Sequence, residues 1–178
     1  MTKEQSVAGL LQTHGQPKVL AKQTHVFYQG DHDARVYFVQ SGLLKAYYLS
    51  ADGKESIKSF IEAGSIIGSL NAALGQGGCS FNLVALEPSQ LLGLPFATLV
   101  EAAAQSHTLA GEVIQHLLAL AMKKEQREYE LLSLSAEQRF VRLRQTSPEL
   151  LKRVTQNDIA RYLGVTPVAL SRIKKRGS

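Results

Sequence analysis

The segment VTQNDIARYLGVTPVALSRIKKR, residues 154–176, carries the side chains whose types and spacing best suggest a chemistry. Thr155 opens a T-x-x-D capping pattern that predicts a helix over 156–163. Gly164 ends that helix in a left-handed turn, and Pro167 suits the first position of a second helix. Two short helices joined in this way form a helix-turn-helix, whose second helix enters the major groove in many DNA-binding proteins. The segment is therefore predicted to bind DNA.

The outward side chains of the second helix are the candidates to read base edges. Arg172 is the strongest, because its planar guanidinium can donate to guanine O6 and N7 together, and Val168 suits a thymine methyl. An ion pair to a neighbour is the alternative for Arg172. The complete set of base-reading candidates is Pro167, Val168, Ser171 and Arg172. Expected on the inner faces of the two helices are Ile159, Ala160, Leu163, Val165, Leu170 and Ile173.

Phosphate contacts are expected at the helix starts and at the basic end of the segment, where N–H groups and cations gather. The candidates are Thr155, Gln156, Thr166, Lys174, Lys175 and Arg176. The alternative for the last three is a solvated terminal cluster. Overall, residues 139–178 carry 10 Lys or Arg and two Asp or Glu, whereas residues 1–138 carry 10 and 13. This asymmetry favours a polyanion-binding module joined to a near-neutral body.

The front of the chain has the pattern of an antiparallel sheet. Glycines recur at intervals of 11 or 12 residues, at Gly30, Gly42, Gly53, Gly64 and Gly75. Between and after them lie short segments rich in β-formers, namely VYFVQ, LLKAYYL, ESIKSFI, FNLVAL and QLLGL. Such spacing predicts an antiparallel sandwich or jelly roll.

Helical texture replaces this pattern after Pro95. Residues 96 to about 132 contain no Pro and one Gly, which predicts one long helix. The candidate dimerisation residues at 3-4 spacing are Ile114, Leu117, Leu118, Ala121 and Leu131, with Lys124 and Glu128 interrupting the seam. The alternative is a helix that packs only on its own sandwich. A further helix, containing RFVRLRQ, is expected between the break at 133–135 and Ser147.

Several functional classes find no support in the sequence. The single Cys79 cannot form an intramolecular disulfide, and the five histidines show no ligand spacing, so no metal or cofactor is predicted. There is no His-x-His pair, phosphate loop or Gly-x-Ser-x-Gly turn, so the chain is not expected to be an enzyme. Without a run of 18 apolar residues or a signal-peptide pattern, we expect a cytoplasmic protein with no membrane partner.

The chain resembles the Crp/Fnr family of bacterial transcription regulators. The resemblance is carried by FYQGDHDARVYFVQSGLLKAYYLSADGKES, GSIIGSL, LLSLSAEQRFVRL and VTQNDIARYLGVTPVALSRIKK. It implies an α+β protein with an N-terminal antiparallel jelly-roll sensor domain (1–105), a long dimerisation helix (106–132) and a C-terminal helix-turn-helix DNA-binding domain (133–178). It also implies a homodimer on a pseudo-palindromic site in double-stranded DNA, with RNA polymerase as a further partner.

The effector is not predicted. Cyclic-nucleotide receptors of this family carry a glutamate for the ribose and an arginine followed by serine or threonine for the phosphate, whereas the matching positions here are Ser69, Cys79 and Ser80. A neutral thiol cannot replace the arginine fork, so we expect no cyclic-AMP binding. An iron-sulfur sensor is excluded, because residues 1–30 contain no cysteine. The candidate effector pocket comprises Gly68, Ser69, Leu70, Cys79 and Ser80.

One departure from the family concerns the end of the sequence. Family members continue from the recognition helix into a two-stranded wing, whereas this sequence stops at Ser178. A minimal DNA-binding domain is therefore expected. The alternative function is a sensor or protein-interaction module whose DNA-binding domain is vestigial. In the favoured function, a ligand at the sandwich changes how the long helices pair and thereby the spacing of the recognition helices.

Overall fold

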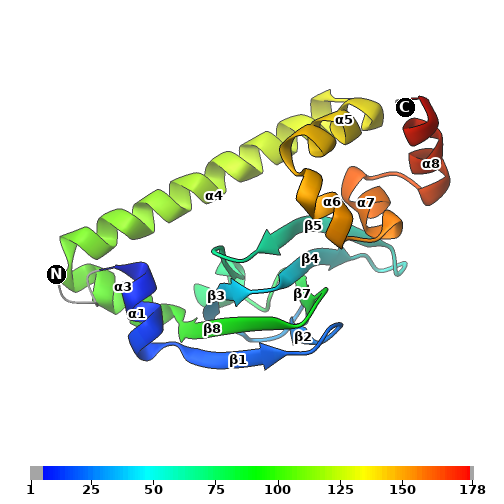
Figure 1. Cartoon of the computed structure of the whole chain (residues 1–178). Coiled ribbons are helices and arrows are strands. Elements are labelled where there is room, and N and C mark those ends of the chain that lie inside the picture. The colour runs from blue at the N-terminus through cyan, green and yellow to red at the C-terminus, as the bar shows by residue number, and fades with distance from the viewer. Residues whose placement is uncertain (1–5, 177–178) are drawn as a thin grey trace.

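The computed structural model describes residues 6–176, and its N-terminal half is built around two four-stranded sheets (Figure 1). Every strand pair is antiparallel. One sheet has the order β1-β8-β3-β6 and the other the order β2-β7-β4-β5. The strands are β1 (Gln16–Leu20), β2 (His25–Phe27), β3 (Arg35–Ser41), β4 (Leu43–Leu49), β5 (Glu55–Glu62), β6 (Ile66–Gly68), β7 (Asn82–Ala85) and β8 (Ser89–Pro95). The predicted antiparallel jelly-roll sandwich is confirmed.

The glycine series marks turns, as the spacing predicts. All five of its members have positive φ, between 68° and 100°. Gly42 shows why no side chain is tolerated, since a Cβ there would lie 2.1 Å from Ser89 Oγ. Between the sheets the core is closed by residues without exposed surface, including Leu44, Leu83 and Leu91. Side chains from both sheets thus meet in one buried cluster between them.

At one end of the sandwich, a second apolar cluster joins the first helix to the helices that follow β8. Here α1 (Val7–His14), α3 (Phe96–Gln105) and the start of α4 (His107–Ser133) pack on β3 and β8. The prediction of one helix from residue 96 to about 132 is wrong at Ser106. That residue has extended backbone, and its hydroxyl accepts a hydrogen bond from Leu109 N at 3.3 Å, which caps a new helix.

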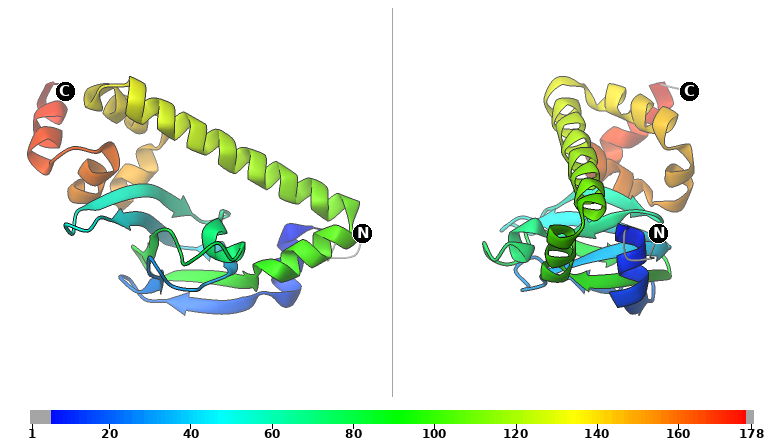
Figure 2. Two further views of the ribbon diagram at one scale, coloured as in Figure 1. Left: turned by 180° about the vertical axis from the view of Figure 1, so that it is seen from behind. Right: turned by 90° about the vertical axis from the view of Figure 1, so that its left-hand side faces the viewer.

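The long helix α4 then crosses the molecule to the C-terminal helices (Figures 1 and 2). It ends before Ser135, which begins α5 (Ala136–Thr146) in a reciprocal capping box with Gln138. Helix α5 ends at the predicted place, next to Ser147. The remaining helices are α6 (Pro148–Arg153), α7 (Gln156–Leu163) and α8 (Pro167–Arg176), and the short α2 (Leu70–Ala73) lies between β6 and β7.

The C-terminal helices share an apolar core with the sandwich. Leu43 and Leu86 from the sandwich lie in the same buried cluster as Phe140, Ile159 and residues of α6 and α8. Figure 1 shows α6 and α7 seated over β4 and β5. None of the helices within residues 6–176 is long and apolar enough to cross a membrane. The two halves of the chain therefore dock directly, in addition to being connected through α4.

Candidate nucleic-acid interface

The helix-turn-helix forms with the caps that the sequence predicts. Thr155 Oγ1 accepts from Asp158 N at 3.1 Å, and α7 spans Gln156–Leu163. Gly164 has φ of 71° in the left-handed region, and Val165 N donates back to Ala160 O at 3.0 Å. Ala169 N then donates to Thr166 Oγ1 at 3.2 Å, at the start of α8. The motif predicted from local chemistry is confirmed.

Apolar residues hold the two helices together and leave the outer face of α8 in solvent. Ile159, Ala160, Leu163 and Leu170 are buried, and Val165 and Ile173 pack partly against them. All four base-reading candidates, Pro167, Val168, Ser171 and Arg172, are exposed. Val168 is 62% exposed, so its side chain is accessible to a partner at this face.

The residues predicted to contact phosphate lie mostly at the surface of the motif. Thr155, Gln156, Thr166, Lys175 and Arg176 are exposed, and Lys174 is half-buried. Lys174 Nζ donates to Gln156 Oε1 at 2.5 Å, so two of these candidates contact each other across the motif. Helix α8 contains no acidic residue, so the cations in its last turn make this end of the helix positively charged.

The predicted effector residues gather where β6 leads into α2. Ser69 is fully buried, and its Oγ accepts from Ser80 N at 3.1 Å. Cys79 is also buried, and burial raises the pKa of its thiol. Gly68 lies against β3, where a Cβ would approach Arg35 O to 2.7 Å, whereas Leu70 begins α2. These positions thus supply neutral hydroxyl, thiol and main-chain groups.

The dimerisation candidates on α4 all face solvent. Ile114, Leu117, Leu118 and Leu131 are between 45% and 55% exposed, and Ala121, Lys124 and Glu128 are exposed with them. Within α4 only Leu109 is buried. Within one chain, α4 therefore leaves these residues in solvent and does not bury them against its own sandwich.

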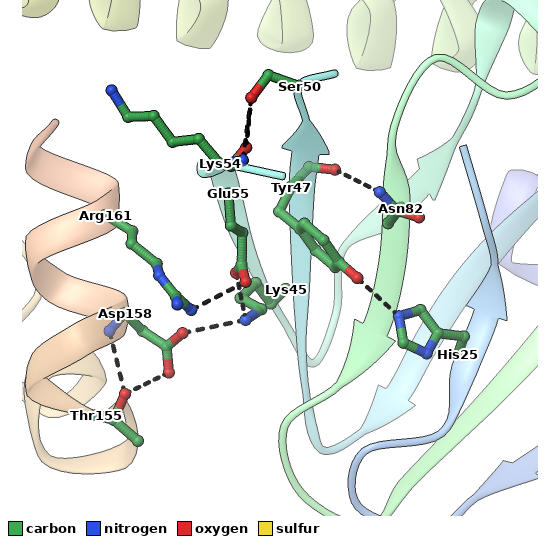
Figure 3. A network of polar contacts seen from close by, with 10 residues as sticks. All are labelled: His25, Lys45, Tyr47, Ser50, Lys54, Glu55, Asn82, Thr155, Asp158 and Arg161. Atoms are coloured by element: carbon green, nitrogen blue, oxygen red, sulfur yellow. Dashed lines mark hydrogen bonds and ion pairs between the residues drawn. The ribbon is translucent and has the colours of Figure 1, made fainter. Parts of the chain in front are cut away.

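A polar network that the sequence analysis missed fixes α7 to the sandwich (Figure 3). Lys45 on β4 is 7% exposed and Asp158 on α7 is 6% exposed. Lys45 Nζ lies 2.6 Å from Glu55 Oε1 and 3.1 Å from Asp158 Oδ1. Arg161 Nη1 lies 2.9 Å from the other Glu55 oxygen. The buried ammonium therefore bridges a carboxylate of each half of the molecule.

The Asp158 carboxylate is stabilised in its charged form. Burial raises its pKa, but the hydrogen bond from Thr155 and the charge of Lys45 outweigh burial and hold the pKa below its ordinary value. Thr155 Oγ1 lies 2.6 Å from Asp158 Oδ2. Since the folded-state pKa is lowered, the stabilisation is present at neutral pH and is lost as the pH falls through that lowered value. The docked arrangement is thus favoured across the physiological range.

The same network continues into the sandwich and along its edge. Tyr47 lies beside Lys45, with the ammonium 5.0 Å from the ring centroid, and its hydroxyl is 3.0 Å from His25 Nε2. On α6, Arg153 pairs with Glu62 at 3.2 Å, with Glu87, and with the main-chain oxygen of Gly42 at 3.1 Å. Arg153 and Arg161 are therefore occupied by sandwich carboxylates in this arrangement. A single lysine inside the apolar strand LLKAYYL was the one signal of this interface in the sequence.

Comparisons with known proteins agree with this architecture. Residues 17–106 match the cyclic nucleotide-binding domain family. The chain is 29% identical over 171 residues to regulatory protein HlyX of Actinobacillus pleuropneumoniae, covering 89% of this chain and 70% of that protein. It is 26% identical over 170 residues to the fumarate and nitrate reduction regulatory protein of Escherichia coli, covering 89% and 67%.

Solved structures match over most of the chain. FixK2 from Bradyrhizobium japonicum superposes with a TM-score of 0.73 at 19% identity, covering 91% of this chain and 83% of that chain. A CooA mutant from Carboxydothermus hydrogenoformans gives a TM-score of 0.76 at 18% identity, covering 94% and 78%. At such identities these matches concern the fold. Because the domain match spans half of the sequence and the regulators align over most of it, the chain belongs to the cyclic nucleotide-binding domain family as a member of the Crp/Fnr regulators.

Proposed function

We propose that this chain is a homodimeric, DNA-binding transcription regulator of the bacterial cytoplasm, in which α8 reads the major groove. The observation that carries the proposal is the capped helix-turn-helix with an exposed, basic outer face on α8. Residues 1–105 are assigned to the sensor domain, 106–132 to the dimerisation helix and 133–178 to the DNA-binding domain. RNA polymerase is a further proposed partner, which rests on the family resemblance of the sequence alone.

Arg172 is assigned the central base contact. Its exposed guanidinium lies between Val168 and the terminal cations on the same helix. A bidentate arginine–guanine contact contributes about 1–3 kcal/mol of discrimination between base pairs, whereas the cations contribute affinity without sequence information. Specificity and affinity are therefore assigned to different side chains of one helix.

The exposed stripe on α4 supports a two-fold dimer. Pairing two copies along Leu117 and Leu118 would bury apolar surface that one chain leaves in water. Two-fold symmetry would place one recognition helix on each side of the axis, which matches half-sites about 34 Å apart on a palindromic site.

We also propose that cyclic AMP is not the effector. Ser69 and Cys79 offer neutral groups, and Ser69 already accepts a hydrogen bond from the Ser80 amide. A cyclic phosphate would thus meet no side-chain cation at the position where the family's receptors carry arginine. Calorimetric titration is expected to give no binding, and a dissociation constant below about 10 µM would contradict this part of the proposal.

Selection of bound sequences from a random duplex pool, at physiological salt and without added ligand, tests the main proposal. Enrichment of a two-fold-symmetric site is the expected result. No enrichment, either alone or after a screen of small-molecule effectors, would contradict DNA binding and favour a sensor module with a vestigial helix-turn-helix. Arg172→Ala is expected to bind the selected site more weakly by about 1–3 kcal/mol. Its affinity for sites that lack the preferred base should change less. Lys22→Ala is the matched control, because it deletes an exposed positive charge on the sandwich, between β1 and β2.

Dimerisation is tested separately by sedimentation equilibrium. Introducing a charge into the stripe with Leu117→Glu and Leu118→Glu is expected to weaken association by about 100-fold or more, because carboxylates at an apolar interface must lose their hydration. Gln115→Glu, which adds one negative charge at another exposed position of α4, is the control. Equal association constants for the two proteins would place the interface elsewhere.

A further inference from the structure

A small cavity lies at the joint between the long helix and the DNA-binding domain, outside the surfaces assigned above. It measures about 80 Å³. Its wall includes Arg127 and Glu130 from the end of α4, Arg139 and Arg142 from α5, and Tyr162 from α7. The cavity therefore touches each of the three helices whose relative orientation positions the recognition helix.

Positive charge exceeds negative charge in this wall. Arg142 Nε lies 2.9 Å from Glu130 Oε1, and the same carboxylate oxygen also accepts from Gln126 Nε2 at 3.0 Å. Among residues 6–176, Glu130 is the only acidic residue lining the cavity, whereas three guanidinium groups line it. The wall therefore holds about two positive charges more than its carboxylate can balance.

The two remaining arginines bond to neutral main-chain oxygens. Arg127 donates to Tyr162 O and stacks on the Tyr162 ring, with its guanidinium carbon 3.8 Å from the ring centroid. Arg139 donates to Leu134 O at 2.6 Å and Leu163 O at 2.9 Å. These bonds hold the arginines in place at the joint, but they provide no counter-charge.

Each of these arginines also has a buried N–H group without an acceptor in the described part of the chain. The atoms are Arg127 Nη1 and Arg139 Nε. A buried charged donor without an acceptor is costly. Burial lowers the pKa of Arg127, and Arg139 lowers it further, while Tyr162 and Glu130 act in the opposite direction. The site thus lacks negative charge and hydrogen-bond acceptors together.

The size of the cavity limits what can supply them. Pockets for nucleotide-sized ligands measure about 300–1,000 Å³, far more than this one, whereas a few waters or a small ion fit. Arginine forks match the oxygen pairs of tetrahedral oxyanions. We propose that the cavity binds a phosphate-class oxyanion through Arg127, Arg139 and Arg142, with a small turn of the guanidinium groups presenting their N–H donors.

Such an anion would stabilise the joint itself. It would connect α4 to α5 and α7. Its binding energy would therefore stabilise only the arrangement in which the DNA-binding domain is docked as seen here. This inference does not depend on the proposed function, because the anion site is complete within one chain and needs neither DNA nor a dimer.

Titration of the whole 178-residue chain with inorganic phosphate, with chloride at matched ionic strength, tests the site without DNA. A saturable rise in melting temperature and a calorimetric binding isotherm are expected with phosphate only. Arg127→Gln should weaken binding about tenfold or more, because it removes a charged donor. Glu130→Gln should strengthen it, because it removes the one competing carboxylate. Arg144→Gln, an exposed charge on α5 outside the cavity wall, is the matched control and should bind like the wild type.

Arg142→Gln provides a second test if Arg127→Gln fails to fold, since the Arg142 side chain is 44% exposed and its loss should also weaken binding. Titration with glycerol phosphate separates free phosphate from a phosphoryl group on a larger molecule, and tighter binding of either one identifies the source. Absence of a saturable phosphate effect, or equal binding by Arg127→Gln and Arg144→Gln, would overturn the proposal.

Discussion

Two lysines on neighbouring strands of one sheet have opposite surroundings. Lys45 on β4 faces the C-terminal helices and is held by carboxylates of Glu55 and Asp158. Lys58 on β5 lies with its ammonium 4.3 Å from the centroid of the Phe81 ring, near Lys124 of α4. Within residues 6–176, no carboxylate pairs with Lys58.

The difference shows where the fold uses buried charge to hold its parts together. At the docking interface the cation is neutralised from both sides, so the helix-turn-helix is fixed to the sandwich. Toward α4 the cation is opposed by another cation, and burial together with Lys124 lowers the pKa of Lys58 to about 8. Charge therefore stabilises the docking of α7 on the sandwich, whereas the two lysines disfavour a close approach of α4 to β5.

Removing Lys45 from its two ion pairs should have the largest effect on stability. Lys45→Ala leaves Glu55 and Asp158 facing each other in a nearly closed interface, and removing one partner of a buried ion pair costs about 3–5 kcal/mol. The free energy of unfolding should fall by about that amount in urea denaturation at pH 7. Lys54→Ala, in the exposed turn of the same hairpin, should change it by less than about 0.5 kcal/mol. A similarly small loss for both variants would mean that the bridge contributes little to docking.

Removing the unbalanced charge should have a smaller effect of opposite sign. Lys58→Met is expected to stabilise the protein by about 1 kcal/mol at pH 7, because the gain from removing a half-buried charge that has Lys124 nearby exceeds the lost contact with the Phe81 ring. The folded-state pKa of about 8 lies below the unfolded value of 10.5, so between them the unfolded chain binds more protons.

The pH dependence sharpens this prediction. Stability of the wild type should rise relative to Lys58→Met as the pH increases from about 8 toward 10.5, and the advantage of the variant should shrink. Guanidinium denaturation at several pH values measures both proteins in parallel. A constant difference across this range would show that Lys58 keeps its ordinary pKa in the folded protein.

Local chemistry explains which parts of this fold were predictable. The helix-turn-helix was found because Thr155, Gly164 and Pro167 act on their immediate neighbours, and capping and turn preferences hold within a few residues. The turns of the sandwich were found for the same reason. The break at Ser106 was missed because a serine inside an apolar helical pattern can also face solvent, and only the packing of α3 on β8 decides between the two.

Contacts between distant residues were not predictable in this way. Lys45 and Asp158 are 113 residues apart, and neither has a neighbour in sequence that requires the other. The cavity at the joint likewise depends on arginines from two helices meeting a tyrosine from a third. Such pairs become visible only when the chain topology brings β4 against α7 and the end of α4 against α5.

Removing Arg161, at the exposed edge of the interface between α7 and the sandwich, should have the smallest effect on stability. Arg161 reaches the same Glu55 that Lys45 binds, but its side chain is 45% exposed. Exposed ion pairs contribute about 0–1 kcal/mol, because water already solvates the charges and ordering the side chain costs entropy. Arg161→Ala should therefore lower the free energy of unfolding by about 0.5 kcal/mol at low salt. The loss of stability in Arg161→Ala should shrink further in about 0.5 M NaCl, because salt at that concentration screens exposed charges beyond a few ångströms. The loss in Lys45→Ala should persist. If the stability losses of Arg161→Ala and Lys45→Ala both vanished in salt, the ion pairs of Lys45 would be as well hydrated as the exposed pair of Arg161. The contrast between Lys45 and Lys58 would then arise from exposure rather than from pairing.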